Sequence, residues 1–161
     1  MNFDGTGNEY LEYTPTGNQT SLSTMSISAW LNPDNNDQYK RHFEFTNGAT
    51  DVLRCEFDNG FGFVFIADFS TTPGRWSTNK ISTNTWTHHL ITYDNSDTAN
   101  DPTIYLDGVD VGVIERVAPV GTGTSSLDLY TIGANSGGGS SSGAWDGDIK
   151  HFGIVTGKHA Q

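Results

Sequence analysis

Short apolar runs separated by turn residues recur along this chain, and this spacing constrains its fold more than any other feature. Within Met25–Leu31, apolar residues at every second position alternate with Ser26, Ser28 and Trp30. Such alternation is typical of strands that bury one face. Asx and Gly residues, as in Asp58-Asn59-Gly60, separate the runs and favour hairpin turns. No stretch keeps a helical apolar period over three turns, so the pattern predicts an all-β fold, an antiparallel β-sandwich or jelly roll. The runs interpreted as strands are Met25–Leu31, His42–Phe45, Val52–Phe57, Phe61–Phe69, Thr85–Asp94, Thr103–Gly108, Val109–Val117, Leu127–Ala134 and Asp148–Val155.

The length of the chain predicts a single domain over residues 1–161. Its 161 residues are enough to bury a core, and 34% hydrophobic with 17% charged residues suits many short strands joined by polar turns. Asn32–Lys40 holds a Pro and an Asn/Asp cluster, and Asn135–Trp145 is rich in Gly and Ser. Because neither segment separates two apolar cores, we expect both to be long loops within one domain.

The charge balance excludes some partners. A formal net charge of −11 at pH 7 argues against nucleic acid, whose phosphates would be repelled. The same charge permits Ca²⁺ or a cationic partner, and solubility alone also explains it. No apolar run approaches the about 20 residues of a membrane helix, and the first residues do not resemble a secretory signal. Cys55 is the only cysteine, so no intrachain disulfide forms, and its alternating neighbours predict a buried strand thiol.

Six blocks of sequence follow one another in an order that is known from one family. They are Phe3–Tyr13 (FDGTGNEYLEY), Ser26–Pro33 (SISAWLNP), Trp86–Asp94 (WTHHLITYD), Ile104–Gly112 (IYLDGVDVG), Thr131–Ala134 (TIGA) and Trp145–Ile154 (WDGDIKHFGI). In this order the chain resembles laminin G-like domains of the concanavalin A-like jelly-roll superfamily, in its pentraxin-related branch. The resemblance implies a concanavalin A-like jelly roll. Asp107-Gly108 in the fourth block is then interpreted as a two-residue turn between strands rather than a cation site.

The sequence predicts no catalytic site. Glycoside hydrolases of this superfamily carry several carboxylates along one strand, and their chemistry needs two that flank the scissile bond. Glu56 and Asp58 share a face at spacing i, i+2, but Gly60 and Phe61 stand where a third acidic residue would be expected. No Ser lies at a strand-to-helix elbow, and the Gly/Ser-rich segment lacks the Lys of a phosphate loop.

A calcium site is one expectation that the resemblance raises, since many relatives hold Ca²⁺ near the sheet rim with Asp or Asn side chains. Ca²⁺ requires six to eight oxygen ligands, typically with two or more carboxylates. The metal-site candidates are Asp94, Asp97, Asp101 and Asp146, with Asp148 and the distant Asp4 expected nearby. Lys150 stands where the family commonly has a further Asp, which removes one ligand. A solvated Asx-rich loop is the alternative for residues 94–101.

A carbohydrate site is a second expectation, because an exposed ring at the rim can stack on a sugar while polar groups take its hydroxyls. The ligand-site candidates are Trp76, Trp145, Tyr39 and Arg75. Trp76 and Arg75 lie in a Pro-Gly turn region, although a Trp that covers the end of the sandwich is the alternative. Trp30 and Trp86 lie in alternating strands and are expected to supply buried area.

Two adjacent histidines, His88 and His89, point to opposite faces of their predicted strand, so they cannot chelate one ion together. One of them is expected to be a hydrogen-bonded histidine of the core or the sheet surface.

The function predicted from these features is a non-enzymatic binding or display module. The family-like strands begin near Met1 and end near Val155, so the chain is interpreted as a bare domain. This favours a virion surface protein, such as a phage capsid decoration, head fibre or tail adhesin, that contacts host glycans or capsid proteins. The alternative is a carbohydrate-binding module of a secreted adhesin or polysaccharide-degrading enzyme. Both interpretations rest on fold analogy, imply a virion-surface or extracellular location, and leave a homo-oligomer open.

Overall fold

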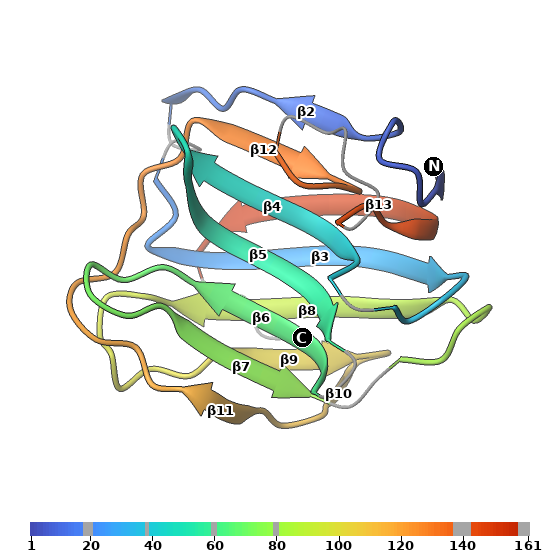
Figure 1. Cartoon of the computed structure of the whole chain (residues 1–161). Coiled ribbons are helices and arrows are strands. Elements are labelled where there is room, and N and C mark those ends of the chain that lie inside the picture. The colour runs from blue at the N-terminus through green and yellow to red at the C-terminus, as the bar shows by residue number, and fades with distance from the viewer. Residues whose placement is uncertain (18–20, 38, 59–60, 79–80, 137–142, 158–161) are drawn as a thin grey trace.

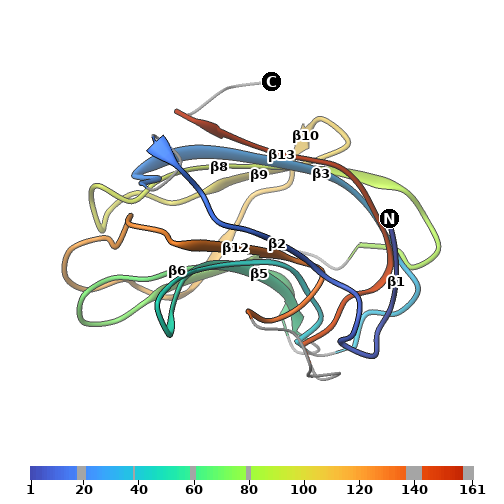
Figure 2. The same cartoon turned by 90° about the horizontal axis from the view of Figure 1, so that it is seen from above.

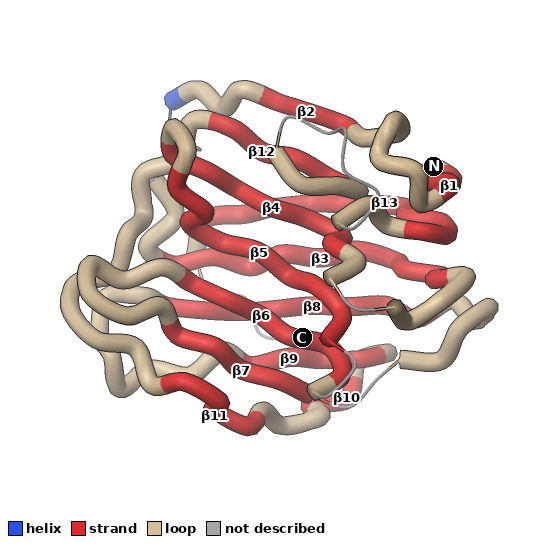
Figure 3. The backbone as a smooth tube through the Cα atoms, in the orientation of Figure 1, coloured by secondary structure: helices blue, strands red, loops and turns tan. Residues whose placement is uncertain are grey.

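The computed structural model of this chain describes residues 1–17, 21–37, 39–58, 61–78, 81–136 and 143–157. Within these ranges it consists of strands and the loops that join them, apart from one short helical turn at Gly17 (Figure 1 and Figure 3). The strands are β1 (Asn2–Asp4), β2 (Leu11–Tyr13), β3 (Thr24–Pro33), β4 (Arg41–Asn47), β5 (Thr50–Asp58), β6 (Gly62–Ala67), β7 (Gly74–Thr78), β8 (Thr87–Asp94), β9 (Thr103–Leu106), β10 (Val109–Asp110), β11 (Ile114–Val117), β12 (Leu129–Ile132) and β13 (Asp146–Thr156). Among the described residues, no helix has the length and apolar character needed to cross a membrane.

Two sheets face each other, as Figure 2 shows from above. Sheet A has the strand order β1-β13-β3-β8-β9-β10, and sheet B has the order β11-β7-β6-β5-β4-β12-β2. Neighbouring strands of both sheets pair antiparallel, for example β3 with β8 and β5 with β6. The predicted all-β antiparallel sandwich is therefore confirmed.

The core between the sheets is rich in aromatic rings. Phe43 and Phe45 of β4 point inward, and their ring centroids are 4.7 Å apart. Phe63 and Phe65 do the same from β6, and Cys55 is buried on β5 as predicted. Since successive strand residues point to opposite faces, the residues between these positions lie on the outer face of sheet B.

The β9–β10 hairpin confirms the turn predicted at Asp107-Gly108. Leu106 pairs with Val109 across the turn, and both turn residues have positive φ, 49° at Asp107 and 81° at Gly108. Positive φ at both central residues is the geometry that tight hairpins require, and Asp and Gly tolerate it. One Asp107 carboxylate oxygen accepts a hydrogen bond of 2.8 Å from the His88 backbone N–H. The acidic tip is thus part of the hairpin.

Two segments differ from the strands expected from the sequence. Gly74–Thr78, interpreted as a turn region, is the strand β7. The single strand expected over Val109–Val117 is divided at Gly112 (φ 65°), with β10 pairing to β9 in sheet A and β11 pairing to β7 in sheet B. The chain thus changes sheet at this glycine. The turn predicted at residues 58–60 and the Gly/Ser-rich segment 135–145 lie partly outside the described residues.

Candidate functional site

Trp76, expected at an exposed rim, lies in the core. Its side chain is 0% exposed and packs against Tyr93, with 5.2 Å between ring centroids. The indole Nε1–H donates a hydrogen bond of 2.6 Å to the Asp101 carboxylate. The ring also lies directly over Gly74, where any Cβ would clash with it. The prediction that Trp76 stacks on a sugar is wrong, because β7 turns this side chain inward.

Trp145 is also a core residue, only 1% exposed. Its ring stacks on Phe57 at 5.2 Å between centroids and meets His42 edge-on at 6.0 Å. The residue directly precedes β13, and its backbone N–H donates to the Gly133 carbonyl at 2.8 Å. Its predicted role as an exposed sugar contact is therefore wrong as well.

Trp30, expected to be buried, is 39% exposed on the outer face of sheet A. Its neighbours Ala29 and Leu31 point into the core, so the alternation of β3 directs Trp30 outward. Its ring lies 5.2 Å from that of His88, the residue paired with it on β8. The sequence already carried this signal, because Trp30 alternates with the apolar set of its strand.

Trp86 lies beside it, just before β8, where the Lys150 Nζ stands 4.0 Å from the centre of its ring. Trp30, Trp86, Lys150 and His151 together line a shallow hollow of about 390 Å³. We call these four residues the aromatic platform. A cation held over an indole face is attracted by the ring, so Lys150 and Trp86 order each other. The platform offers aromatic faces together with the N–H donors of Lys150 and His151.

The two adjacent histidines separate as predicted. The His88 Nε2 lies 2.9 Å from the Ser28 hydroxyl on the outer face of sheet A, whereas His89 is buried. Burial lowers the pKa of His89 to about 3, with a smaller contribution from His88. Burial likewise holds the pKa of His42 well below its ordinary value, assisted by His89 at 6.2 Å between ring centroids. Both core histidines are therefore neutral at pH 7.

The four aspartates proposed as calcium ligands do not gather into one group. The carboxylates of Asp94 and Asp97 each accept a hydrogen bond from a backbone N–H two residues later, at 3.0 and 2.9 Å. Asp101 accepts from the indole of Trp76, and Asp146 accepts from Asn35. Within the described ranges, no set of three or more His, Cys, Asp or Glu residues is arranged to hold a metal.

Asp4 does lie near Asp146, as the family resemblance implied. The two residues are paired across β1 and β13. Hydrogen bonds from the hydroxyl and backbone N–H of Thr6 lower the pKa of Asp4. Calcium binding stays a prediction for this end of the sandwich.

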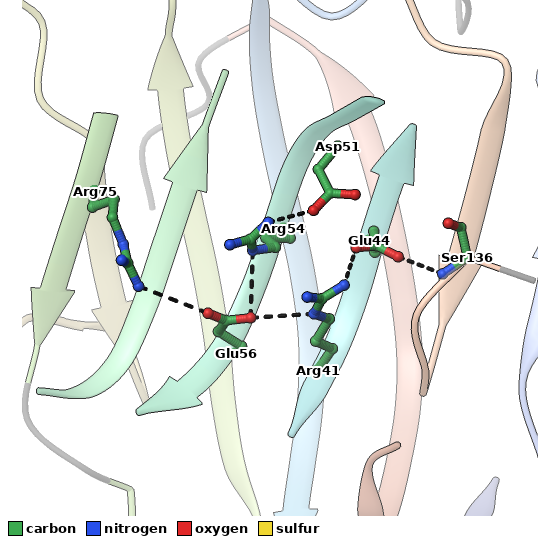
Figure 4. Close-up of polar contacts among 7 residues, drawn as sticks. All are labelled: Arg41, Glu44, Asp51, Arg54, Glu56, Arg75 and Ser136. Atoms are coloured by element: carbon green, nitrogen blue, oxygen red, sulfur yellow. Dashed lines mark hydrogen bonds and ion pairs between the residues drawn. The ribbon is translucent and has the colours of Figure 1, made fainter. Parts of the chain in front are cut away.

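The outer face of sheet B carries a network of arginines and carboxylates (Figure 4). Glu56 of β5 is buried, and Arg41 donates to one of its oxygens at 3.2 Å. The Nε of Arg54 lies 3.4 Å from the same oxygen, and the Nη2 of Arg75 lies 3.9 Å from the other. Glu56, which the sequence placed on one face with Asp58, thus lies within 4 Å of three guanidinium groups, and this gives it a structural role.

Glu44 of β4 belongs to the same network. It accepts bonds from Arg41 and from the backbone N–H of Ser136. Burial raises the pKa of Glu44, and the Ser136 and Arg41 contacts oppose that rise. The backbone at Ser136 therefore contacts this face.

Arg75 and Tyr39 are the remaining ligand-site candidates. Arg75 is partly exposed on β7, where it lines a cleft of about 440 Å³ with Arg54, Asp51 and Asp68. Tyr39 is 47% exposed with a φ of 66°. Because the two tryptophans are in the core, the four predicted residues do not form one site.

Comparison with known protein families agrees with the β-sandwich described above. A laminin G-type family model, described as the concanavalin A-like lectin/glucanases superfamily, matches residues 4–158. This chain is a laminin G-like domain. Laminin G-like domains are generally non-catalytic binding modules. No curated protein matches the sequence.

Solved structures share the fold of this laminin G-like domain at low sequence identity. A native heptameric SAP-like pentraxin from Limulus polyphemus is 14% identical with a TM-score of 0.72, over 99% of this chain and 76% of that one. Domains LG4-5 of the mouse laminin alpha1 chain are 13% identical with a TM-score of 0.69, over 95% of this chain and 40% of that one. Domain 4 of a GH43 extracellular arabinanase from Geobacillus stearothermophilus, solved with arabinotriose, is 19% identical with a TM-score of 0.58, over 86% and 63%.

Proposed function

We propose that this laminin G-like domain is a non-catalytic module that binds glycans through the aromatic platform. The observation that carries the proposal is the exposed Trp30 ring, which stands beside Trp86 on the outer face of sheet A. An indole face covers the C–H face of a sugar, while neighbouring N–H groups bond to its hydroxyls. The arabinotriose complex of the structurally similar arabinanase domain supports the same class of ligand.

The aromatic platform lies on sheet A, whereas the sequence predicted a site on loops at the rim of the sandwich. Trp30 projects from the middle of a ten-residue strand, and His88 and Lys150 flank it from the two neighbouring strands. A ring on a rigid sheet loses little conformational freedom on binding. The proposal therefore needs no loop to close over the ligand.

The test is glycan binding by matched single-residue variants. A glycan array identifies a ligand, and calorimetry then compares the wild-type domain with Trp30→Ala and Tyr39→Ala. We expect Trp30→Ala to weaken binding by roughly five- to thirtyfold, since removing an aromatic contact costs about 1–2 kcal/mol. Tyr39→Ala, at another exposed aromatic residue, serves as the control and should bind like the wild type. Equal affinity of Trp30→Ala and the wild type would contradict the proposal.

The display role on a virion surface stays a prediction from the sequence, as do capsid partners, a homo-oligomer and an extracellular location. Copurification of the domain with particles in a fixed copy number would support the virion role. Glycan binding by the platform is compatible with a tail adhesin and with a module of a secreted enzyme.

A further inference from the structure

A second hollow lies on the opposite sheet, at one end of β5, β6 and β7. It is the cleft of about 440 Å³ lined by Arg54 and Arg75. Both arginines are paired with Ile66 of β6, one from each side, so the three residues form a row across three strands. Neighbouring strands are about 4.8 Å apart, which places the two arginine backbones about 10 Å apart. Both guanidinium groups reach toward Glu56, and Ile66 lines the hollow between the two arginine positions.

The guanidinium of Arg75 retains donors for a ligand. Its Nη2 lies 3.9 Å from the Glu56 carboxylate, which is beyond hydrogen-bond reach. No hydrogen bond to this guanidinium is found among the described residues. Arg54, by contrast, is held by ion pairs with Asp51 and Glu56. Figure 4 shows Arg75 at one edge of the network, on the other side of Glu56 from Arg41 and Glu44.

The same cleft also supplies acceptors and an apolar floor. Asp51 and Asp68 line it together with Ile66 and Pro73. One Asp68 oxygen accepts the Thr124 hydroxyl at 3.1 Å, and the carboxylate has further acceptor capacity. Donors, acceptors and an apolar floor within one hollow are what a sugar ring with vicinal hydroxyls requires.

The charge of the cleft favours a neutral ligand. Arg54 and Arg75 are balanced by Asp51 and Asp68 along its lining, and the chain as a whole carries a net charge of −11. An acidic sugar would meet two carboxylates in the cleft and a repulsive field around it. A neutral sugar carries no charge for these groups to repel, and it can donate its hydroxyls to the carboxylates.

We propose that this cleft is a second glycan site, which holds one neutral sugar residue over Ile66 between Arg75 and Asp68. Arg75 donates to one hydroxyl and Asp68 accepts from its neighbour. Because the cleft and the aromatic platform lie on opposite sheets, a domain with both sites bridges two glycan chains. The cleft stands on its own residues, and only this bridging rests on the proposed function.

The experiment is a titration of the ¹⁵N-labelled domain, followed by NMR, with glucose, galactose, arabinose, glucuronate and galacturonate. We expect at least one neutral sugar to give saturable shifts at residues 49–54, 66–68 and 74–75. Arg75→Gln and Asp68→Asn should each weaken that binding by roughly tenfold or more, as loss of a hydrogen bond to a charged group does. Arg116→Gln is the matched control, because Arg116 bonds to Ser77 and stacks on Phe61 outside the cleft. A thermal melt of each variant establishes that it is folded.

Three results would overturn the proposal: no saturable shifts in the cleft with any of the five sugars, binding of the uronates alone, or wild-type affinity in both cleft variants. Trp30→Ala separates this site from the platform. If that variant keeps the shifts in the cleft but loses array binding, both sites are supported. If it loses the cleft shifts, the cleft is not an independent site.

Discussion

The two buried histidines should make the stability of this domain unusually sensitive to mild acid. His89 lies in the core with its ring 4.5 Å from that of Phe63, and neither of its ring nitrogens has a hydrogen-bond partner among the described residues. Burial lowers the pKa of His89 to about 3, whereas a histidine in the unfolded chain titrates near about 6.5. Between these values the unfolded state binds the extra proton, so the free energy of unfolding falls as the pH falls.

The magnitude follows from the two pKa values. Lowering the pH from about 7 to about 5 should reduce the free energy of unfolding by about 2 kcal/mol through His89 alone. At a pH below both the folded and the unfolded pKa of His89, the reduction reaches about 5 kcal/mol. The pKa of His42 is lowered for the same reason, so its contribution has the same sign. A domain of ordinary stability would lose a large part of it.

The assay is urea unfolding, monitored by tryptophan fluorescence, of the wild type, His89→Phe and His151→Gln at both pH values. His89→Phe removes the imidazole that takes up a proton when the chain unfolds. Between pH 7 and pH 5, the free energy of unfolding of this variant should therefore fall by about 2 kcal/mol less than that of the wild type. His151→Gln is the control at an exposed histidine and should behave like the wild type. An identical pH dependence for His89→Phe and the wild type would refute the reasoning.

Three further predictions concern stability and metal binding. Trp76 and Asp101 should show a coupling energy of about 1–2 kcal/mol in a double-mutant cycle of Trp76→Phe and Asp101→Ala, measured by urea unfolding, because a buried indole N–H loses its acceptor; a coupling near zero would mean that water replaces the carboxylate. Glu56→Ala should destabilise the domain by about 2–3 kcal/mol in the same assay, which is less than for a fully buried pair because the three arginines remain partly exposed and can be hydrated; a loss within the error of the measurement would show that the arginines rearrange without cost. For calcium, Ca²⁺ at 100 times its Kd should stabilise the fold by about 2.7 kcal/mol, so a melting temperature that EDTA leaves unchanged would remove the predicted site.

Local sequence was sufficient for the strands and for several of their side chains. The alternation of Met25–Leu31 gave β3, and the neighbours of Cys55 gave a buried thiol. Asp107-Gly108 gave the β9–β10 turn, because the required positive φ depends on those two residues themselves. Six blocks in order were enough to indicate the laminin G-like family, which the match over residues 4–158 confirms.

The residues that form the proposed binding surfaces could not be predicted from the local sequence. Alternation shows which residues of a strand share a face, but a large ring on either face is compatible with it. Trp30 was expected in the core, although it alternates with the apolar residues of its strand, and Trp76 was expected at the rim; the structure has Trp30 exposed and Trp76 buried. Trp76 could be placed only with Tyr93 and Asp101, which come from other parts of the chain.

The sequence by itself determined the fold class and family, because strand periodicity, turn chemistry and motif order are local properties. Only the tertiary structure decided where a ligand can bind. The platform joins β3, β13 and the residue before β8, and the cleft joins β5, β6 and β7. Both depend on strand pairing between distant segments, since a sheet brings side chains together across strands rather than along them.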